Sequence, residues 1–146
     1  MLRAVVLLAT LTLIASAQSI TGCRLSANQY DPNSTSNMYG RCGSRYSPDS
    51  INNPYGKYGS PYSPYSVTNR YATDAPRITA EDGTYLGRYS ANQFAQDSTS
   101  NEFGQHGSPF APNSINNHFG LYGSPYSPQS PTNPYTVTAP VFEEDE

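Results

Sequence analysis

The chain has 146 residues and a net charge of −3, and it combines 13 tyrosines and 5 phenylalanines with 13 prolines and 11 glycines. The small acidic charge provides no basic surface to displace counterions from nucleic acid, which argues against a nucleic-acid partner. Proline and glycine at this frequency argue against long helices and regular strands, while so many rings are unusual for a disordered chain.

The first element is an apolar run over residues 4–16 that follows Arg3. Residues 15–17, Ala-Ser-Ala, provide the small-x-small pattern that a signal peptidase accepts. The run is too short to span a bilayer comfortably, which takes about 20 residues. We therefore expect residues 1–17 to be a helical signal peptide and the exported chain to begin at Gln18.

The two cysteines leave two interpretations open. Residues 20–23, Ile-Thr-Gly-Cys, fit the site at which bacterial lipoproteins are cut and acylated, so the signal would cover 1–22 and Cys23 would carry a lipid anchor. Polar residues between the apolar run and the cysteine argue against this. Alternatively, Cys23 and Cys42 pair in an oxidising compartment, closing a loop of about 20 residues and contributing about 3 kcal/mol.

The rest of the chain repeats itself. Residues 26–30 recur, with one Tyr-to-Phe change, as residues 90–94, which defines an offset of 64 residues and two modules over 21–84 and 85–142. Within each module a 16-residue unit runs three times. Its serine recurs at Ser34, Ser50, Ser66, Ser98, Ser114 and Ser130, and its asparagine at Asn37, Asn53, Asn69, Asn101, Asn117 and Asn133. Two rings recur in each unit, at Tyr30, Tyr39, Tyr46, Tyr55, Tyr62, Tyr71, Phe94, Phe103, Phe110, Phe119, Tyr126 and Tyr135.

Each unit alternates rings with turns. Serine and asparagine side chains hydrogen-bond nearby backbone and hold turns. Four units contain Gly-x-x-Gly-Ser, beginning at Gly40, Gly56, Gly104 and Gly120. These paired glycines allow positive φ, so the chain can reverse twice in each unit. A single unit cannot bury its own rings, so we expect rings of neighbouring units to stack into a core that replaces an aliphatic interior.

These features predict a mostly irregular, all-β fold of turn-rich tandem 16-residue repeats with short strands, either a rudimentary β-solenoid or a hairpin stack. A mostly irregular, extended chain is the alternative. Residues 72–93 lack the motif and are expected to join the modules, with a turn at Asp82-Gly83. Residues 143–146 are acidic and are expected to form a solvated tail.

Catalysis finds little support in the sequence. His106 occupies a repeat position that elsewhere holds Cys42, Tyr58 or Tyr122, and His118 occupies a variable position. The serines recur in every unit, and a nucleophile has no reason to be copied six times. We predict a protein that is not an enzyme, with no catalytic, cofactor-binding or metal-binding residues.

The motifs resemble those of a group of uncharacterised exported bacterial repeat proteins. Residues 53–60, Asn-Pro-Tyr-Gly-Lys-Tyr-Gly-Ser, are similar to their Asn-Pro-Tyr-Gly-x-Tyr-Gly-Ser motif, and residues 62–66 are similar to Tyr-Ser-Pro-x-Ser. In the first module Gly22-Cys23 replaces the Leu-Gly of the pattern. The resemblance covers nearly all of the chain after the signal segment, implies export and carries no functional residue.

We therefore expect an exported structural or interaction protein of the bacterial envelope or extracellular space, secreted, periplasmic or lipid-anchored. The alternative is a glycan-binding module in which exposed Tyr58, Tyr65 and Tyr122 form the contact surface. The corresponding partners are an envelope polysaccharide or further copies of the chain.

Overall fold

The computed structural model describes residues 19–144, so the expected signal peptide lies outside the described residues. Within that range the regular elements are three short strands, β1 (Arg77–Thr79), β2 (Tyr85–Arg88) and β3 (Val141–Glu143). They form one antiparallel sheet in the order β2-β1-β3. The remaining described residues form turns and irregular structure without a helix. The expectation of a mostly irregular chain with a few β-strands is confirmed.

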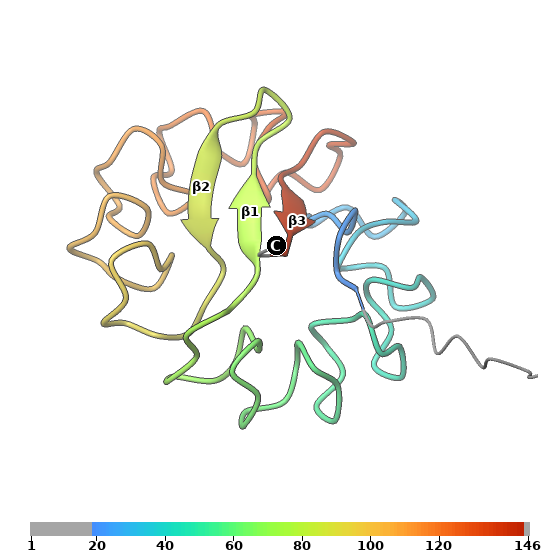
Figure 1. The fold of residues 1–146 in the computed structure, drawn as a ribbon. Coiled ribbons are helices and arrows are strands. Elements are labelled where there is room, and N and C mark those ends of the chain that lie inside the picture. The colour runs from blue at the N-terminus through green and yellow to red at the C-terminus, as the bar shows by residue number, and fades with distance from the viewer. Residues whose placement is uncertain (1–18, 145–146) are drawn as a thin grey trace, which may run out of the picture.

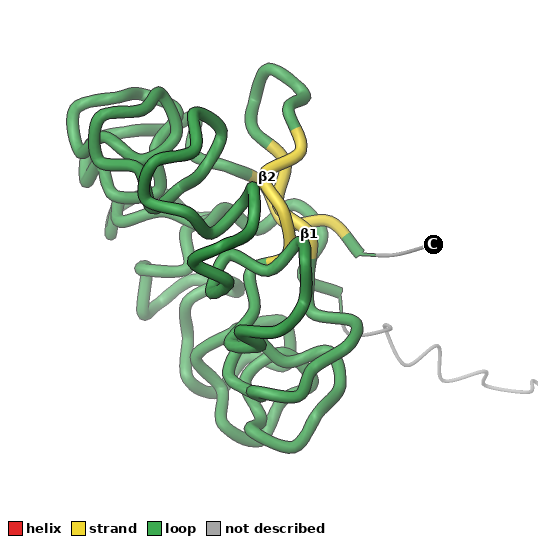
Figure 2. Tube along the Cα trace, turned by 90° about the vertical axis from the view of Figure 1, so that its left-hand side faces the viewer, coloured by secondary structure: helices red, strands yellow, loops and turns green. Residues whose placement is uncertain are grey.

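The chain winds around the sheet in two halves, the residues before the turn at Asp82-Gly83 and the residues after it (Figure 1). Residues before β1 lie on one side of it and residues between β2 and β3 on the other, and the strands lie toward one face of the body (Figure 2). The two ends of the described chain meet at β3. There the N–H of Gly22 donates to the carbonyl of Phe142 at 3.3 Å, and the N–H of Phe142 donates to the carbonyl of Cys23 at 2.8 Å.

The units are built from consecutive turns. In the first unit the N–H groups of Ser34, Asn37 and Gly40 each donate to the carbonyl three residues earlier, at 3.1–3.2 Å. The Gly-x-x-Gly-Ser segment adds a step of four residues, from the Ser44 N–H to the Gly40 carbonyl at 3.0 Å. The same bonds recur at the other three such segments. Strands are few because these units satisfy their backbone groups locally instead of in ladders between strands.

The repeated serines form the interior of the units. All six are completely buried, with no accessible surface. Each accepts a hydrogen bond from the backbone N–H two residues later, at 3.0–3.2 Å. Ser34, Ser66, Ser98 and Ser114 also donate to the carbonyl eight residues earlier. One hydroxyl therefore connects successive turns of the chain.

The expectation that the repeated rings form the core is wrong. All twelve point to solvent, with exposed fractions of 81–100%. Each ring follows a turn in which its own N–H donates to the side-chain oxygen two residues earlier, as in the bond from Tyr46 to Ser44. The inside of each unit is too narrow for a ring. A Cβ built on Gly43 would lie 2.0 Å from the carbonyl oxygen of Asn37.

The same geometry corrects the role expected of the paired glycines. None of them has positive φ, which is found in the described residues only at Gly22, Gly83 and Gly87. Instead, the second glycine of each pair allows two stretches of backbone to touch. At Gly59, Gly107 and Gly123 an added Cβ would lie 2.1 Å from an asparagine carbonyl oxygen.

The apolar core lies where the two halves meet. It contains Ile20, Cys23, Leu25, Cys42, Tyr58, Ile78, Ala80, Leu86, Ile115, Tyr122 and Phe142. The strands contribute Ile78, Leu86 and Phe142, each completely buried. The interior is thus partly aliphatic, and much of it comes from residues outside the 16-residue motif.

The joining segment and the C-terminal end are both ordered parts of the sheet. The expected turn at Asp82-Gly83 is confirmed, because Gly83 has φ +89° and its N–H donates to the carbonyl of Ala80 at 2.9 Å. Glu143 ends β3, and the Glu144 carboxylate accepts a hydrogen bond from the N–H of Ile20 at 3.3 Å. Glu143 is exposed, as expected of a solvated tail, but both residues are tied to the fold by β3 and by this bond.

The two halves contact each other through equivalent bonds, 64 residues apart. At the centre of the sheet Ile78 lies opposite its equivalent, Phe142. Four hydrogen bonds between the halves form two pairs. Within each pair the two donors are 64 residues apart in the sequence, and so are the two acceptors. Leu25 N–H donates to Pro140 and Tyr89 N–H to Pro76, both at 2.9 Å, while Arg24 donates to the Ala139 carbonyl at 2.7 Å and Arg88 to that of Ala75 at 2.8 Å. An approximate two-fold axis therefore relates the two halves and passes between β1 and β3.

Candidate functional site: ring pairs and a central disulfide

The exposed rings are held in pairs by asparagine. Tyr46 and Tyr55 belong to one unit, and Asn53 lies between them in the sequence. Its side-chain N–H donates to the carbonyl of Ser47 at 3.1 Å, and its side-chain oxygen accepts the Tyr55 N–H at 3.0 Å. One amide thus fixes the backbone beside both rings.

The same bridge occurs in all six units. The asparagine side-chain N–H donates at 2.9–3.2 Å, and its oxygen accepts at 3.0–3.1 Å. The ring pairs are Tyr30–Tyr39, Tyr46–Tyr55, Tyr62–Tyr71, Phe94–Phe103, Phe110–Phe119 and Tyr126–Tyr135. We call these twelve residues the ring-pair array. Their backbone is fixed although their side chains are exposed.

Two of the ring pairs enclose grooves. The groove at Tyr46 and Tyr55 has a volume of about 400 Å³ and is also lined by Arg45, Asn53 and Pro54. The groove at Tyr62 and Tyr71 has a volume of about 480 Å³ and is also lined by Pro61, Thr68, Asn69 and Arg70. Both offer two aromatic faces, an amide and a guanidinium within one open site.

The tyrosines expected to form the contact surface lie elsewhere. Tyr58 and Tyr122 are only 1% and 5% exposed and belong to the core, so the expectation of an exposed contact surface is wrong for these two. The Tyr122 hydroxyl donates to the Asp82 carboxylate at 2.7 Å, and this hydrogen bond lowers the pKa of Asp82. Tyr65 is 42% exposed, with the Lys57 ammonium 4.4 Å from its ring centroid.

The sequence signal that separates buried from exposed rings is the position within Gly-x-x-Gly. Tyr58 and Tyr122 stand directly before the second glycine, and both are buried. His106 stands at the same position and packs edge-on against Tyr85, with the two ring centroids 5.1 Å apart. Burial lowers the pKa of His106, and its buried Nδ1 has no hydrogen-bond partner within the described residues. His118 is exposed at the surface.

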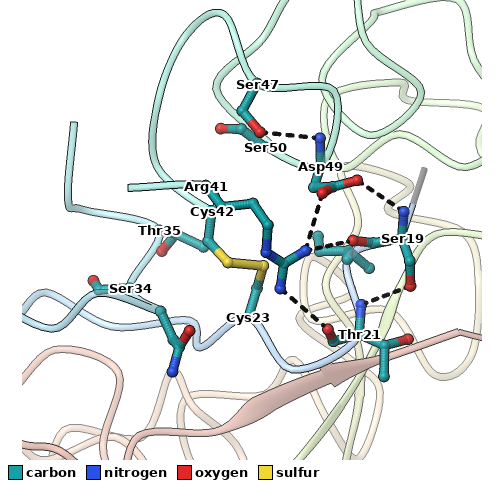
Figure 3. The surroundings of a disulfide bond; sticks show 12 residues. Ser19, Thr21, Cys23, Ser34, Thr35, Arg41, Cys42, Ser47, Asp49 and Ser50 are labelled. Atoms are coloured by element: carbon teal, nitrogen blue, oxygen red, sulfur yellow. Dashed lines mark hydrogen bonds and ion pairs between the residues drawn. A yellow bond between two sulfur atoms is a disulfide. The ribbon is translucent and has the colours of Figure 1, made fainter. Parts of the chain in front are cut away.

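Cys23 and Cys42 form a disulfide in the core, with their Cα atoms 5.6 Å apart (Figure 3). Both residues are buried, at 0% and 1% exposure. A sulfur in a disulfide carries no lipid, so this structure represents the disulfide interpretation of the two cysteines. In the second half the equivalent residues are Gly87 and His106, and a Cβ on Gly87 would lie 2.7 Å from the His106 Cβ.

The segment before Cys23 is tied down beside the disulfide (Figure 3). The Arg41 guanidinium donates to the Ser19 carbonyl at 2.9 Å and pairs with the Asp49 carboxylate at 3.0 Å. That carboxylate also accepts the Ser19 N–H at 2.8 Å. With Ile20 completely buried, residues 19–23 form an integral part of the fold.

Two further features concern ions and membranes. Within residues 19–144 no three His, Cys, Asp or Glu side chains cluster as a metal site would require. The same residues contain no helix of the length and apolarity needed to cross a bilayer.

Comparisons of the chain with known protein families, with proteins of established function and with solved structures found no match.

Proposed function

We propose that this chain is an exported, non-catalytic interaction protein that binds its partner through the ring-pair array. The observation that carries the proposal is the exposure of twelve rings at 81–100%. Single exposed apolar residues are ordinary, but a repeated set of exposed rings is typical of an interaction surface. Phe103 and Phe119 are 99% and 100% exposed and have no hydroxyl to solvate, so folding alone does not account for them.

A polymer fits the repetition of this surface. One ring pair recurs with each 16-residue unit, so a ligand with a repeated chemical unit can contact several pairs at once, and the weak contacts reinforce each other. We propose that the units form a stack of turn-built repeats in two modules, 21–84 and 85–142. The recurring serine and asparagine bonds support this architecture.

Among polymers, a glycan is favoured by the grooves between the rings. Their volumes of about 400 and 480 Å³ lie in the range of small-ligand sites. Aromatic faces contact the apolar faces of sugar rings, while Arg45 or Arg70 and the bridging asparagine offer polar groups to the hydroxyls. An envelope or extracellular polysaccharide is therefore our candidate ligand, and self-association through the same rings is the second.

Export supports this function and is itself part of the proposal. The expected signal peptide would be cleaved before Gln18, just ahead of Ser19, which the structure holds in place. A disulfide suits an oxidising compartment outside the cytoplasm. Mass spectrometry of the mature N-terminus tests this step. A chain that begins at Gln18 is expected. A chain that begins at a lipid-modified Cys23 would contradict the Gln18 start and the disulfide, and a chain that keeps residues 1–17 would contradict export.

Binding is tested by co-sedimentation with insoluble cellulose, chitin and peptidoglycan. We expect at least one of these to retain the wild-type chain, and the double variant Tyr46→Ala/Tyr55→Ala to be retained less. The control is Tyr65→Ala, which changes an exposed tyrosine outside the array. Sedimentation velocity over a range of concentrations tests self-association. Concentration-dependent oligomers that disappear in the double variant would support the second candidate, and a chain that neither binds a glycan nor associates would overturn the proposal.

A further inference from the structure

A second site lies between the two halves, separate from the ring-pair array. It is a groove of about 620 Å³ whose floor contains Leu25, Ile51, Tyr89 and Ile115. These four side chains belong to the core cluster or pack against it. The Tyr89 ring also contacts Phe142 of β3, with the ring centroids 6.0 Å apart. The floor of the groove is therefore the surface of the core.

The groove continues into a smaller one of about 290 Å³, which shares Ile51, Asn52 and Tyr89 with it. The approximate two-fold relation exchanges the two, because residues 25–27 and 131–132 line the larger groove and residues 89–91 and 67–68 line the smaller. In the smaller groove Tyr89 takes the place of Leu25, and Val67 takes the place of Pro131. The larger groove has the size of a small-ligand site.

The two asparagine side chains along the larger groove have used their own donors. The two N–H groups of Asn52 donate to the carbonyls of Thr35 and Gly43, at 2.8 and 3.0 Å. Asn116 does the same at the equivalent position, toward Thr99 and Gly107. These bonds orient both amides, so each presents its side-chain oxygen as an acceptor.

Two hydroxyls of the rim, those of Ser36 and Thr132, follow the same pattern. Ser36 donates to the carbonyl of Ser26 at 2.6 Å, and Thr132 donates to that of Gly123 at 3.3 Å. Tyr89 is the exception, because within the described residues its hydroxyl, whose pKa is raised by burial, has no hydrogen-bond partner and keeps its donor for a ligand. A ligand that fits these groups brings several donors of its own.

Charge narrows the class of ligand further. No Asp, Glu, Lys, Arg or His lines the larger groove. A charged ligand would lose solvation there without gaining a counter-charge. The apolar floor suits a ligand with one apolar face, and the fixed acceptors around it suit hydroxyl groups at the edge of that face.

We propose that the larger groove is a binding site for one neutral, polyhydroxylated ring of the size of a monosaccharide or an inositol. The apolar face of the ring lies on Ile51, Ile115 and Tyr89, and its hydroxyls donate to Asn52 and Asn116. This site does not depend on the ring-pair array. A chain that fails to bind polysaccharide can still bind the small ring, and the reverse also holds.

The test is a nuclear magnetic resonance titration of the full mature chain, with its disulfide intact. The probes are glucose, galactose, N-acetylglucosamine and myo-inositol, each taken to about 50 mM so that binding with a Kd in the low millimolar range approaches saturation. We expect saturable shifts of the Asn52 and Asn116 side-chain amides with at least one probe. No saturable shift with any of the four, or shifts confined to the ring-pair array, would overturn the proposal. Tighter binding of glucuronate than of glucose would also contradict it.

Equivalent positions in the two halves provide matched variants. Ala27 lines the larger groove and Ala91 is its equivalent in the smaller one. We expect Ala27→Phe to weaken binding at least about tenfold, and Ala91→Phe to change it by less than about twofold. Tyr89→Phe removes only a hydroxyl, and the loss of one hydrogen bond should weaken binding by about threefold to tenfold without filling the groove. Equal affinities in Ala27→Phe and the wild type would refute the site.

Discussion

Buried serine hydroxyls connect the turns inside each repeat unit, and replacing one of these serines tests how much the bonds stabilise the fold. Ser114 has no accessible surface. Its hydroxyl donates to the carbonyl of His106 at 3.2 Å and accepts the N–H of Asn116 at 3.1 Å. In Ser114→Ala both backbone groups lose this partner. A fully buried group left unsatisfied costs about 1–3 kcal/mol, and both of these bonds are only part-buried, so we expect the free energy of unfolding to fall by about 2–4 kcal/mol, less than the largest sum of two such costs.

Ser108→Ala is the matched control for this prediction. Ser108 lies six residues earlier, at the end of the preceding unit, and its hydroxyl only accepts the N–H of Phe110 at the surface, where water can replace it. Its loss should cost no more than about 1 kcal/mol. Urea unfolding followed by near-ultraviolet circular dichroism of the buried tyrosines measures both, with the difference taken from the midpoints at constant m value. Equal losses in the two variants would refute a hydroxyl-bonded interior.

Three further outcomes follow from the core. Replacing both Cys23 and Cys42 by serine should lower the free energy of unfolding by about 3 kcal/mol, measured by urea unfolding, because the disulfide closes a loop with a sequence separation of 19. Tyr122→Phe should raise the pKa of Asp82 toward its ordinary value of 3.8, which a carbon-13 titration of the carboxyl measures, since the tyrosine hydroxyl is the main cause of the lowered pKa. Burial lowers the pKa of His106 below 6.5, so its contribution to stability is intact above pH 6.5 and is lost as the pH falls below that value; unfolding curves of wild type and His106→Phe should diverge there.

Local patterns in the sequence were reliable guides to local structure. Ser, Asn and Gly at a fixed spacing predict turns, and the structure forms turns at those residues because their side chains bond the adjacent backbone. The Asp82-Gly83 turn followed from the same chemistry. The pairing of Cys23 with Cys42 was one of two alternatives, and the sequence could not choose between them because lipidation and disulfide formation use the same sulfur.

The expectation from the sequence was wrong where apolar residue types are exposed in the structure. Rings such as Tyr55 and Phe119 are the most apolar residues of their units, so burial was the natural expectation. The structure exposes them because three-residue turns leave no interior wide enough for a ring, as the 2.0 Å approach of a Gly43 Cβ to the Asn37 oxygen shows. Only three-dimensional packing reveals that width. The serine column carried the missing signal, because an invariant small polar residue in every unit is compatible with a buried hydroxyl.

The two candidate sites differ in how much of each could be predicted from the sequence. The ring pairs could be listed from the sequence, but their exposure could not be predicted. The central groove could not be predicted at all. Its floor brings Leu25, Ile51 and Ile115 together with Tyr89 from widely separated parts of the chain, and only the packing of the two halves places them side by side. No local spacing encodes such a contact.

A hydroxyl-bonded interior also explains how the surface can vary without loss of the fold. The units depend on buried serines, bridging asparagines and glycines at close backbone contacts, and the exposed rings take no part in these bonds beyond their backbone N–H. Tyr39 and Tyr55 can therefore become Phe103 and Phe119 in the second half while the asparagine bridge keeps its geometry, with oxygen-to-N–H distances of 3.0 and 3.1 Å. The scaffold therefore does not constrain which ring occupies each exposed position. If the rings were structural, Tyr55→Ala would lower stability as much as Ser114→Ala, whereas this architecture requires the stability to stay within about 0.5 kcal/mol of the wild type.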